Sequence, residues 1–368
     1  MHRFINELFS HSQSMPKIIL TTGGTGGHIF PALAVAEALK ETFASLELLF
    51  IGANYGLEQK LVTQASINFV GLNVQGVLGK GLRSPRAFLK LLKSVPQAIK
   101  IIRKFNPNCI IGFGNYASFS TIIAAGLLKI PVVIHEQNAI PGVTNKICSF
   151  FAQKICVSLP HTSGFNQKKC VLTGNPIRQD INRESCVNNK KFESKRLLIL
   201  GGSLGATALN SYICKILPQL VRSKVEIIHQ TGKNDWENVV NTYIKYGYYK
   251  ENVFPFISSM GKAYEWADLI LCRAGASTVA EICAAGVPAI FVPFPAAIHD
   301  HQTKNASLVE KAGGAVVIPE KEINAVESVI LNFFANPGKL AEMSKKLLKL
   351  AQPEAAVNVV KVIKNVMN

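Results

Sequence analysis

The 368-residue chain lacks several patterns that define other classes of protein. Its eight cysteines include no C-x-x-C pair and no ligand-like spacing with histidine, which excludes a zinc ribbon or a disulfide framework and indicates a reducing compartment. The acidic metal motif D-x-D does not occur. There is also no run of about 18 apolar residues, which argues against a membrane-spanning helix. A folded, cytoplasmic protein is the simplest class that remains.

The beginning of the chain lacks the features of a signal peptide. The residues MHRFINELFSHSQS have neither a basic start nor a sustained apolar run. Met15 immediately precedes the first expected strand. We therefore expect residues 1–15 to be an extension that precedes the folded domains.

Acidic residues are missing from a long part of the first half. No Asp or Glu occurs from Lys60 through His135, and the whole chain has a formal net charge of +17. This predicts contact with an anionic partner, such as nucleic acid, an acidic membrane or a phosphorylated substrate. Residues 84–104 are expected to form a basic amphipathic helix; an ordinary surface helix with a solvated charged face is an equally good explanation of the pattern. The preceding VQGVLGKGLRS favours a membrane or diphosphate contact.

Short β-branched runs alternate with helical stretches, which is the pattern of parallel sheets covered by helices. Strands are expected in the first half at Lys17–Thr21, Leu46–Ile51, Cys109–Gly112 and Val132–Glu136. A second strand, glycine loop and helix begin near Gly201, so the chain contains two nucleotide-fold halves. The polar, turn-rich stretch 171–195 is the expected linker.

The first glycine loop is GGTGGH, which ends at His28. It is not a G-x-G-x-x-G loop, because Ile29 occupies the third glycine position, and no Gly-Lys-Ser/Thr follows it. Glycines allow a ligand close to the backbone, and the following helix offers free N–H groups to negative charge. His28 is a candidate general base for a hydroxyl. A capping or packing histidine is the more common alternative for such a position.

Three later segments contain candidate ligand contacts. GGSLGA begins at Gly201 and adds the Ser203 hydroxyl to a second glycine loop. Glu281 follows a strand end, where a carboxylate can accept hydrogen bonds from both ribose hydroxyls. A capping acid that the helix dipole stabilises is an equally good explanation of Glu281. Gln302, in DHQTKNA, can hydrogen bond to sugar hydroxyls.

Seven segments, each weak alone, occur together and in order between Pro16 and the C-terminus. They are GGTGGHIFPALAVAEAL, HEQNAIPGVTNK, GNPIR, GGSLGA, FISSM, WADLILCRAGASTVAEICAAGVPAIFVPFP and DHQTKNA. The set resembles the MurG family of GT-B glycosyltransferases. The resemblance implies an α/β protein with two Rossmann-like domains that face a cleft and a C-terminal helix that returns to the N-terminal domain. The implied domains are residues 16–174 with about 352–368, facing acceptor and membrane, and residues 175–351, binding UDP-GlcNAc.

The resemblance also implies a reaction. GlcNAc would move, with inversion, from UDP-GlcNAc to the C4 hydroxyl of MurNAc in undecaprenyl-diphosphate-MurNAc-pentapeptide, the step from lipid I to lipid II. This step belongs to peptidoglycan synthesis, and thereby to cell-wall biogenesis, cell shape and cell division. No cofactor or metal would be required. The enzyme would be a peripheral protein on the cytoplasmic face of the bacterial inner membrane.

Two other functions remain open from the sequence. One is another GT-B enzyme, either a UDP-GlcNAc 2-epimerase or a transferase with a soluble acceptor. The acid-free region argues against a soluble acceptor. The other is a nucleic-acid-binding protein. Only the net charge suggests it, and the sequence lacks the aromatic stacking pattern that such proteins usually show.

The resemblance implies a role for each matching residue. His28 would be the general base, and Glu136 would orient or assist it. Glu281 would bind the ribose and Gln302 the GlcNAc hydroxyls, while Asn115 departs from the glycine that relatives commonly have. The implied UDP-GlcNAc contacts are Thr25, Gly26, Gly27, Asn138, Arg178, Ser203, Ile257, Ala276, Ser277, Thr278, Val279, Ala280, Glu281 and Gln302. The implied acceptor and membrane contacts are Lys80, Arg83, Arg86, Lys90, Lys93, Tyr116 and Ser118.

Overall fold

The computed structural model describes most of the chain. The described residues are 15–24, 26–54, 58–74, 85–160, 162–181, 191–202, 205–248, 250–297 and 300–368, with the backbone alone for 85–90 and 250. Four of the residues implied above therefore lie wholly outside the described part: Thr25, Lys80, Arg83 and Ser203. The side chains of Arg86 and Lys90 are also outside it.

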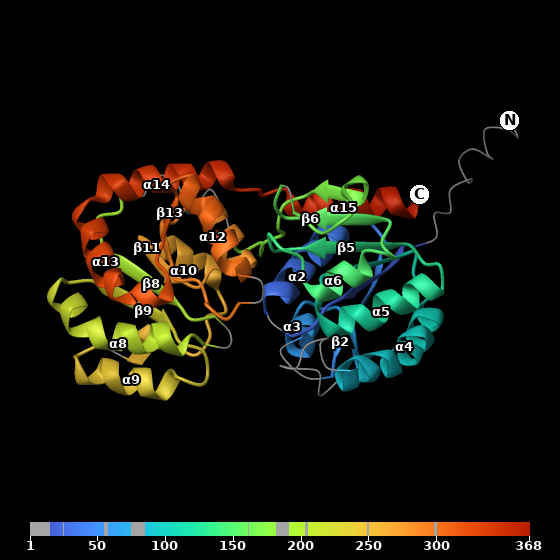
Figure 1. The fold of residues 1–368 in the computed structure, drawn as a ribbon, viewed down its shortest axis with the longest axis horizontal. Helices are drawn as coiled ribbons and strands as arrows, with labels where there is room; N and C mark the ends of the chain where they lie inside the picture. Colours follow the sequence, from blue (N-terminus) through green and yellow to red (C-terminus); the bar gives the residue numbers. More distant parts are fainter. Residues whose placement is uncertain are drawn as a thin grey trace, which may run out of the picture.

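The described strands form two parallel sheets (Figure 1). The first has the order β3-β2-β1-β4-β5-β6-β7 and the second has the order β10-β9-β8-β11-β12-β13. The first sheet contains β1 Lys17–Thr21, β2 Glu47–Ala53, β3 Asn68–Leu72, β4 Cys109–Gly112, β5 Val132–Glu136, β6 Lys154–Val157 and β7 Cys170–Leu172. The second contains β8 Arg196–Leu200, β9 Glu226–Gln230, β10 Val253–Phe254, β11 Leu269–Cys272, β12 Ala289–Phe291 and β13 Ala315–Val317.

Both sheets share one connectivity, because β10-β9-β8-β11-β12-β13 repeats the order of β3-β2-β1-β4-β5-β6. In each sheet the order reverses at the first strand, between β1 and β4 or between β8 and β11. Ligands of open parallel sheets bind outside the carboxyl ends of the strands at this switch point. The loops that matter are therefore those that follow β1, β4, β8 and β11.

Helices cover the faces of both sheets. Those of the first half are α2 Gly26–Thr42, α3 Glu58–Gln64, α4 Pro85–Phe105, α5 Asn115–Leu127 and α6 Val143–Cys148, with the 3₁₀ turn η1 Gln167–Lys169. Those of the second half are α8 Thr207–Arg222, α9 Trp236–Lys245, α10 Met260–Trp266, α11 Ala276–Ala285, α12 His301–Lys311, α13 Val326–Ala335 and α14 Pro337–Leu350. The 3₁₀ turns η2 Lys250–Asn252 and η4 Glu320–Ala325 complete this half.

The last helix, α15 Ala355–Met367, packs on the first sheet and not on the second (Figure 1). Val359 and Ile363 are completely buried in the same core cluster as Ile18, Leu20 and Val35. Burial of such side chains contributes roughly 1.5–3 kcal/mol each. The predicted return of the C-terminal helix to the N-terminal domain is confirmed.

Three of the four strands predicted in the first half are confirmed at both ends. β1, β4 and β5 begin and end at the predicted residues, and β2 is shifted by one residue at its start and two at its end. All residues of β4 and β5 are buried, as expected for central strands covered by helices on both faces. The strands β3, β6 and β7 were not among the predicted ones.

Candidate active site

The switch-point loops of the two sheets lie against each other. The Ser277 hydroxyl, at the start of α11, donates a hydrogen bond of 2.8 Å to the Gly27 carbonyl at the start of α2. On the same side, the Ala139 N–H donates to Asn305 Oδ1 of α12 at 3.1 Å. Asn305 also donates to the Ala274 carbonyl at 3.3 Å and is 1% exposed. The loops that were implied to bind donor and acceptor therefore contact each other directly.

His28 lies in the first turn of α2, next to the Gly27 carbonyl that accepts from Ser277. Its ring is partly exposed, and its Nδ1 lies 3.1 Å from Gln137 Oε1. Gln137 follows β5 and is 2% exposed. Its Nε2 donates to the carbonyl of Phe113, which follows β4, at 3.1 Å. The sheet order places the ends of β1, β4 and β5 side by side, which is why these three residues meet.

Glu136 organises its own loop. Oε1 accepts hydrogen bonds from the N–H and the side-chain amide of Asn138, at 3.0 and 3.1 Å. Oε2 accepts from the Gly142 N–H at 3.2 Å and from Asn145 Nδ2 at 2.9 Å. The hydrogen-bond partner of His28 is thus Gln137 and not Glu136. The carboxylate positions the loop that carries Asn138.

Glu58 and Asn115 fasten the first glycine loop. The Gly24 N–H donates to Glu58 Oε1 at 2.5 Å, and Asn115 Nδ2 donates to the Gly23 carbonyl at 2.6 Å. Glu58 is 0% exposed, its Oε2 has no partner within the described residues, and burial raises its pKa. Gly24 has a φ of 89°, and a Cβ there would lie 2.2 Å from Asn115 Nδ2. Asn115, at a position where relatives commonly have glycine, therefore links two loops of the expected acceptor site.

The other residues implied for acceptor and membrane contact lie in different environments. Lys93 is exposed on α4, and Tyr116 is partly buried in the first turn of α5. Ser118 is 0% exposed and has no hydrogen-bond partner in the described part of the chain. A Cβ at Gly112 would lie 2.5 Å from its Oγ, so Ser118 packs inward against β4. Ser118 does not present its hydroxyl to a surface ligand in this conformation.

Glu281 is part of a buried cluster in the second domain. The Tyr264 hydroxyl donates to Oε2 at 2.9 Å, and Arg178 Nε lies 3.2 Å from Oε1. Burial raises the pKa of Glu281, while the Arg178 charge and the Tyr264 hydrogen bond act in the opposite direction. The Arg178 guanidinium also lies over the Phe30 ring of α2, 3.5 Å from its centroid. Arg178 and Glu281, implied to bind the same nucleotide, are thus brought together.

The remaining donor-side residues surround the start of α11. This helix begins at Ala276 and ends at Ala285, and Gly286, with a φ of 64°, is its C-cap. Gln302 Oε1 accepts from the N–H groups of Ala274, at 3.2 Å, and Phe294, at 3.0 Å. Within the described residues its amide NH₂ has no hydrogen-bond partner, so it can donate to an acceptor such as a sugar hydroxyl. The other implied residues here are Ser277, Thr278 and Ala280, which are partly exposed, Val279, which is buried, and Ile257, partly buried after β10.

Several residues of this site were missed by sequence reasoning. Gln137 and Asn305 lie inside the quoted segments HEQN and DHQTKNA, but nothing in their spacing indicated which side chain each would meet. Tyr264 and Glu58 stand beside no glycine loop in the sequence. The one feature of the sequence that could have pointed to these four residues is a polar side chain within an apolar stretch or within one of the quoted segments.

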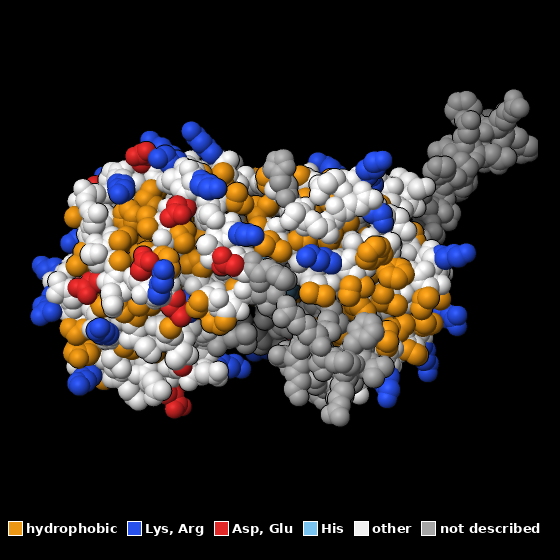
Figure 2. Space-filling model, viewed as in Figure 1, with side chains coloured by type: hydrophobic (Ala, Val, Ile, Leu, Met, Phe, Trp, Pro, Cys, Tyr) orange, Lys and Arg blue, Asp and Glu red, His pale blue; other side chains and the backbone are white. Residues whose placement is uncertain are grey.

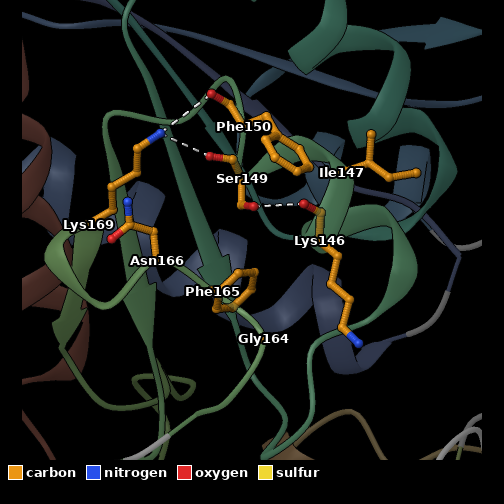
Figure 3. A pocket seen from close by; sticks show the side chains of 8 residues that line it. All are labelled: Lys146, Ile147, Ser149, Phe150, Gly164, Phe165, Asn166 and Lys169. Carbon is orange, nitrogen blue, oxygen red and sulfur yellow. Dashed lines mark hydrogen bonds between the residues drawn. The ribbon is translucent and has the colours of Figure 1, made fainter.

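A separate pocket of about 340 Å³ lies in the first domain (Figure 3). Lys169 Nζ, on one of its walls, donates to the carbonyls of Ser149 and Phe150 at 3.2 and 3.4 Å. The pocket is lined by Lys146, Ile147, Ser149, Phe150, Gly164, Phe165, Asn166 and Lys169. None of these residues is among those implied for catalysis or donor binding. Within the described residues, no cluster of three or more His, Cys, Asp or Glu side chains could hold a metal ion.

Two parallel-sheet domains with the same connectivity, contacting loops and a returning C-terminal helix define a protein of the GT-B fold. Residues 18–157 match the glycosyltransferase family 28 N-terminal domain, and residues 196–359 match the family 28 C-terminal domain. The chain belongs to this family and, within it, to the MurG glycosyltransferases.

The relatives of the chain extend over nearly its whole length. It is 43% identical over 366 residues to the "UDP-N-acetylglucosamine--N-acetylmuramyl-(pentapeptide) pyrophosphoryl-undecaprenol N-acetylglucosamine transferase" of Nitratidesulfovibrio vulgaris (strain DSM 19637 / Miyazaki F), covering 94% of this chain and 96% of that one. The Lawsonia intracellularis protein of the same name is 45% identical over 324 residues, covering 86% and 88%. The crystal structure of Acinetobacter baumannii MurG, 34% identical, superposes with a TM-score of 0.73 over 95% of this chain and 99% of that one.

The fold is also similar to that of a UDP-GlcNAc 2-epimerase. The Neisseria meningitidis enzyme bound to UDP-GlcNAc is 14% identical, with a TM-score of 0.66 over 95% of this chain and all of that one. At this identity the likeness concerns the fold alone. It does not favour an epimerase over a transferase.

Proposed function

We propose that the chain transfers GlcNAc from UDP-GlcNAc to the C4 hydroxyl of MurNAc in undecaprenyl-diphosphate-MurNAc-pentapeptide, with inversion at the anomeric carbon. The observation that carries this proposal is the contact between Ser277 and Gly27. It joins the start of α11, on the donor side, to the residue beside His28. The acceptor hydroxyl and the donor sugar would then meet where the two helices begin.

Each chemical role has a residue in this arrangement. His28 takes the proton of the attacking hydroxyl, and one in-line displacement releases UDP, so no covalent nucleophile is needed. The helix N-termini at Gly26 and Ala276 stabilise the diphosphate charge. Glu281 binds the ribose and Gln302 the GlcNAc hydroxyls. Thr25, Ser203 and the loops around them are proposed to complete the donor site.

We further propose that the enzyme works as a peripheral protein on the cytoplasmic face of the bacterial inner membrane. The described helices include none that is long and apolar enough to cross a bilayer. Apolar side chains gather over α4, α5 and α6, with Lys and Arg around them (Figure 2). Leu127 is 63% exposed and Phe150 81%, while Lys93 and Lys100 are exposed on α4. A surface of this kind suits an anionic leaflet.

The direct test is transfer of labelled GlcNAc from UDP-GlcNAc to a lipid-linked MurNAc acceptor. We expect label in the lipid product, whereas label in free ManNAc or UDP-ManNAc would replace the proposal with an epimerase. Salt-sensitive sedimentation with anionic vesicles, and none with DNA or RNA, is the expected partner preference. Binding to nucleic acid and not to vesicles would contradict the membrane part alone.

A further inference from the structure

A short chain of hydrogen bonds runs from the protein interior to His28. The Phe113 carbonyl accepts from Gln137 Nε2 at 3.1 Å, and Gln137 Oε1 lies 3.1 Å from His28 Nδ1. Gln137 is 2% exposed and Phe113 is 0% exposed. Two of the three members are therefore fixed within the packed core, and the imidazole is attached to their outer end.

The direction of each bond in this chain follows from the chemistry of its ends. A backbone carbonyl can only accept, so the end of the Gln137 amide that faces Phe113 must be its NH₂ group. The opposite end is then the amide oxygen, which also can only accept. The hydrogen in the bond to His28 must therefore come from the imidazole, which puts a proton on Nδ1.

A neutral imidazole has a single ring proton, and the partner of one ring nitrogen decides the state of the other. With the proton on Nδ1, the lone pair resides on Nε2. Within the described residues, Nε2 has no hydrogen bond. The ring thus has one nitrogen anchored to the core and one available to take a proton from a ligand.

We propose that Gln137 is a positioning residue that fixes His28 in the Nδ1–H tautomer and makes Nε2 the basic nitrogen. The proposal rests on the proposed role of His28 as general base. A neutral amide suits this task, because it orients the ring without the attraction for an imidazolium that a carboxylate would exert. The neighbouring carboxylate, Glu136, has both oxygens engaged by its own loop.

The test is ¹⁵N NMR of the imidazole nitrogens of His28 in the full-length protein, at an alkaline pH where the ring is neutral. We expect a protonated Nδ1 and an unprotonated Nε2 in the unmodified enzyme. A protonated Nε2 would overturn the proposal without recourse to any variant. This measurement does not depend on activity, so it separates the tautomer from the catalytic role.

Two variants of similar size provide the matched comparison. Gln137→Met removes the acceptor, so we expect the ring proton to redistribute toward Nε2 and kcat to fall by about 10²–10⁴-fold, the usual contribution of a positioned base. Gln137→Glu loses the donor to the Phe113 carbonyl but still offers an acceptor oxygen to His28, so it should retain the Nδ1–H form. The KM for UDP-GlcNAc should stay unchanged in Gln137→Met. If Gln137→Met shifts the tautomer but leaves kcat normal, the positioning role is wrong. If His28→Ala leaves kcat unchanged, only the role of His28 as general base is wrong, and the tautomer assignment stands.

Discussion

Ser277 of the second domain donates a hydrogen bond to the carbonyl of Gly27 in the first domain, over a sequence separation of 250 residues. The contact brings the start of α11 against the start of α2. Both helix N-termini carry free N–H groups and a partial positive charge. The proposed catalytic site is therefore formed by two helix starts from two domains and by no single motif.

Asn305 also connects the two domains, and its loss should destabilise the protein. Asn305→Ala leaves the Ala139 N–H and the Ala274 carbonyl without their partner. Because such groups are costly to leave unpaired, we expect a loss of about 1–3 kcal/mol in the free energy of unfolding, measured by urea denaturation. Lys304→Ala, at an exposed neighbour, is the control and should change it by less than about 0.5 kcal/mol. Equal midpoints for the two variants would remove Asn305 from this role.

Glu281 should make donor binding sensitive to acid. Burial raises the pKa of this carboxyl above the usual 4.5, so it becomes protonated at a higher pH than an ordinary glutamate. A protonated carboxyl accepts fewer hydrogen bonds from a ribose, so the KM for UDP-GlcNAc should rise as the pH falls through this raised pKa. Glu281→Gln should raise the donor KM at all pH values and abolish this acid dependence.

Tyr264→Phe provides the matched control for Glu281. It removes a hydrogen bond that favours the ionised carboxyl, so the rise in donor KM should begin at a still higher pH. Because the pKa of Glu281 is raised in the folded protein, its protonated form favours folding and its ionised form opposes it. The stability that the protonated carboxyl contributes is therefore lost as the pH rises through the folded-state pKa. An unchanged donor saturation curve in Glu281→Gln would contradict the ribose assignment.

The sequence predicted the central strands, because each is a local pattern. A short β-branched run between polar residues and glycine defined β4. The partners of His28 and Glu281 could not be obtained in this way. Gln137 lies 109 residues from His28, and only the order β1-β4-β5 brings them together. Burial of Ser118 likewise depends on Gly112 of the neighbouring strand, which no spacing along the chain reveals.

Asn115 should tolerate glycine better than alanine. Its φ is 71°, a conformation in which an alanine is disfavoured by about 1–2 kcal/mol and a glycine is not. Both substitutions lose the bonds to the Gly23 carbonyl and the Tyr116 N–H. We therefore expect the free energy of unfolding, measured by denaturation, to be highest for the native protein, lower for Asn115→Gly and lowest for Asn115→Ala. Asn106→Gly, at an exposed position of φ 53°, serves as the control. If Asn115→Ala were more stable than Asn115→Gly, the positive φ at Asn115 would not be what decides the effect of the substitution.

Activity should persist after removal of divalent cations. The helix N-termini at Gly26 and Ala276 are proposed to offset the diphosphate charge. GlcNAc transfer in excess chelator, compared with transfer in added magnesium, measures this directly. Loss of transfer on chelation, restored by magnesium, would show that a metal supplies part of the charge stabilisation.

The central claim, that His28 is the base at the junction of the two domains, is tested most directly by His28→Ala. We expect single-turnover GlcNAc transfer to slow by about 10²–10⁴-fold while the Kd for UDP-GlcNAc, measured by calorimetry, stays the same. The donor site should persist because the hydrogen bonds and ion pair that hold Glu281, Arg178 and Gln302 are made with residues other than His28. Near-normal transfer by His28→Ala would contradict the account.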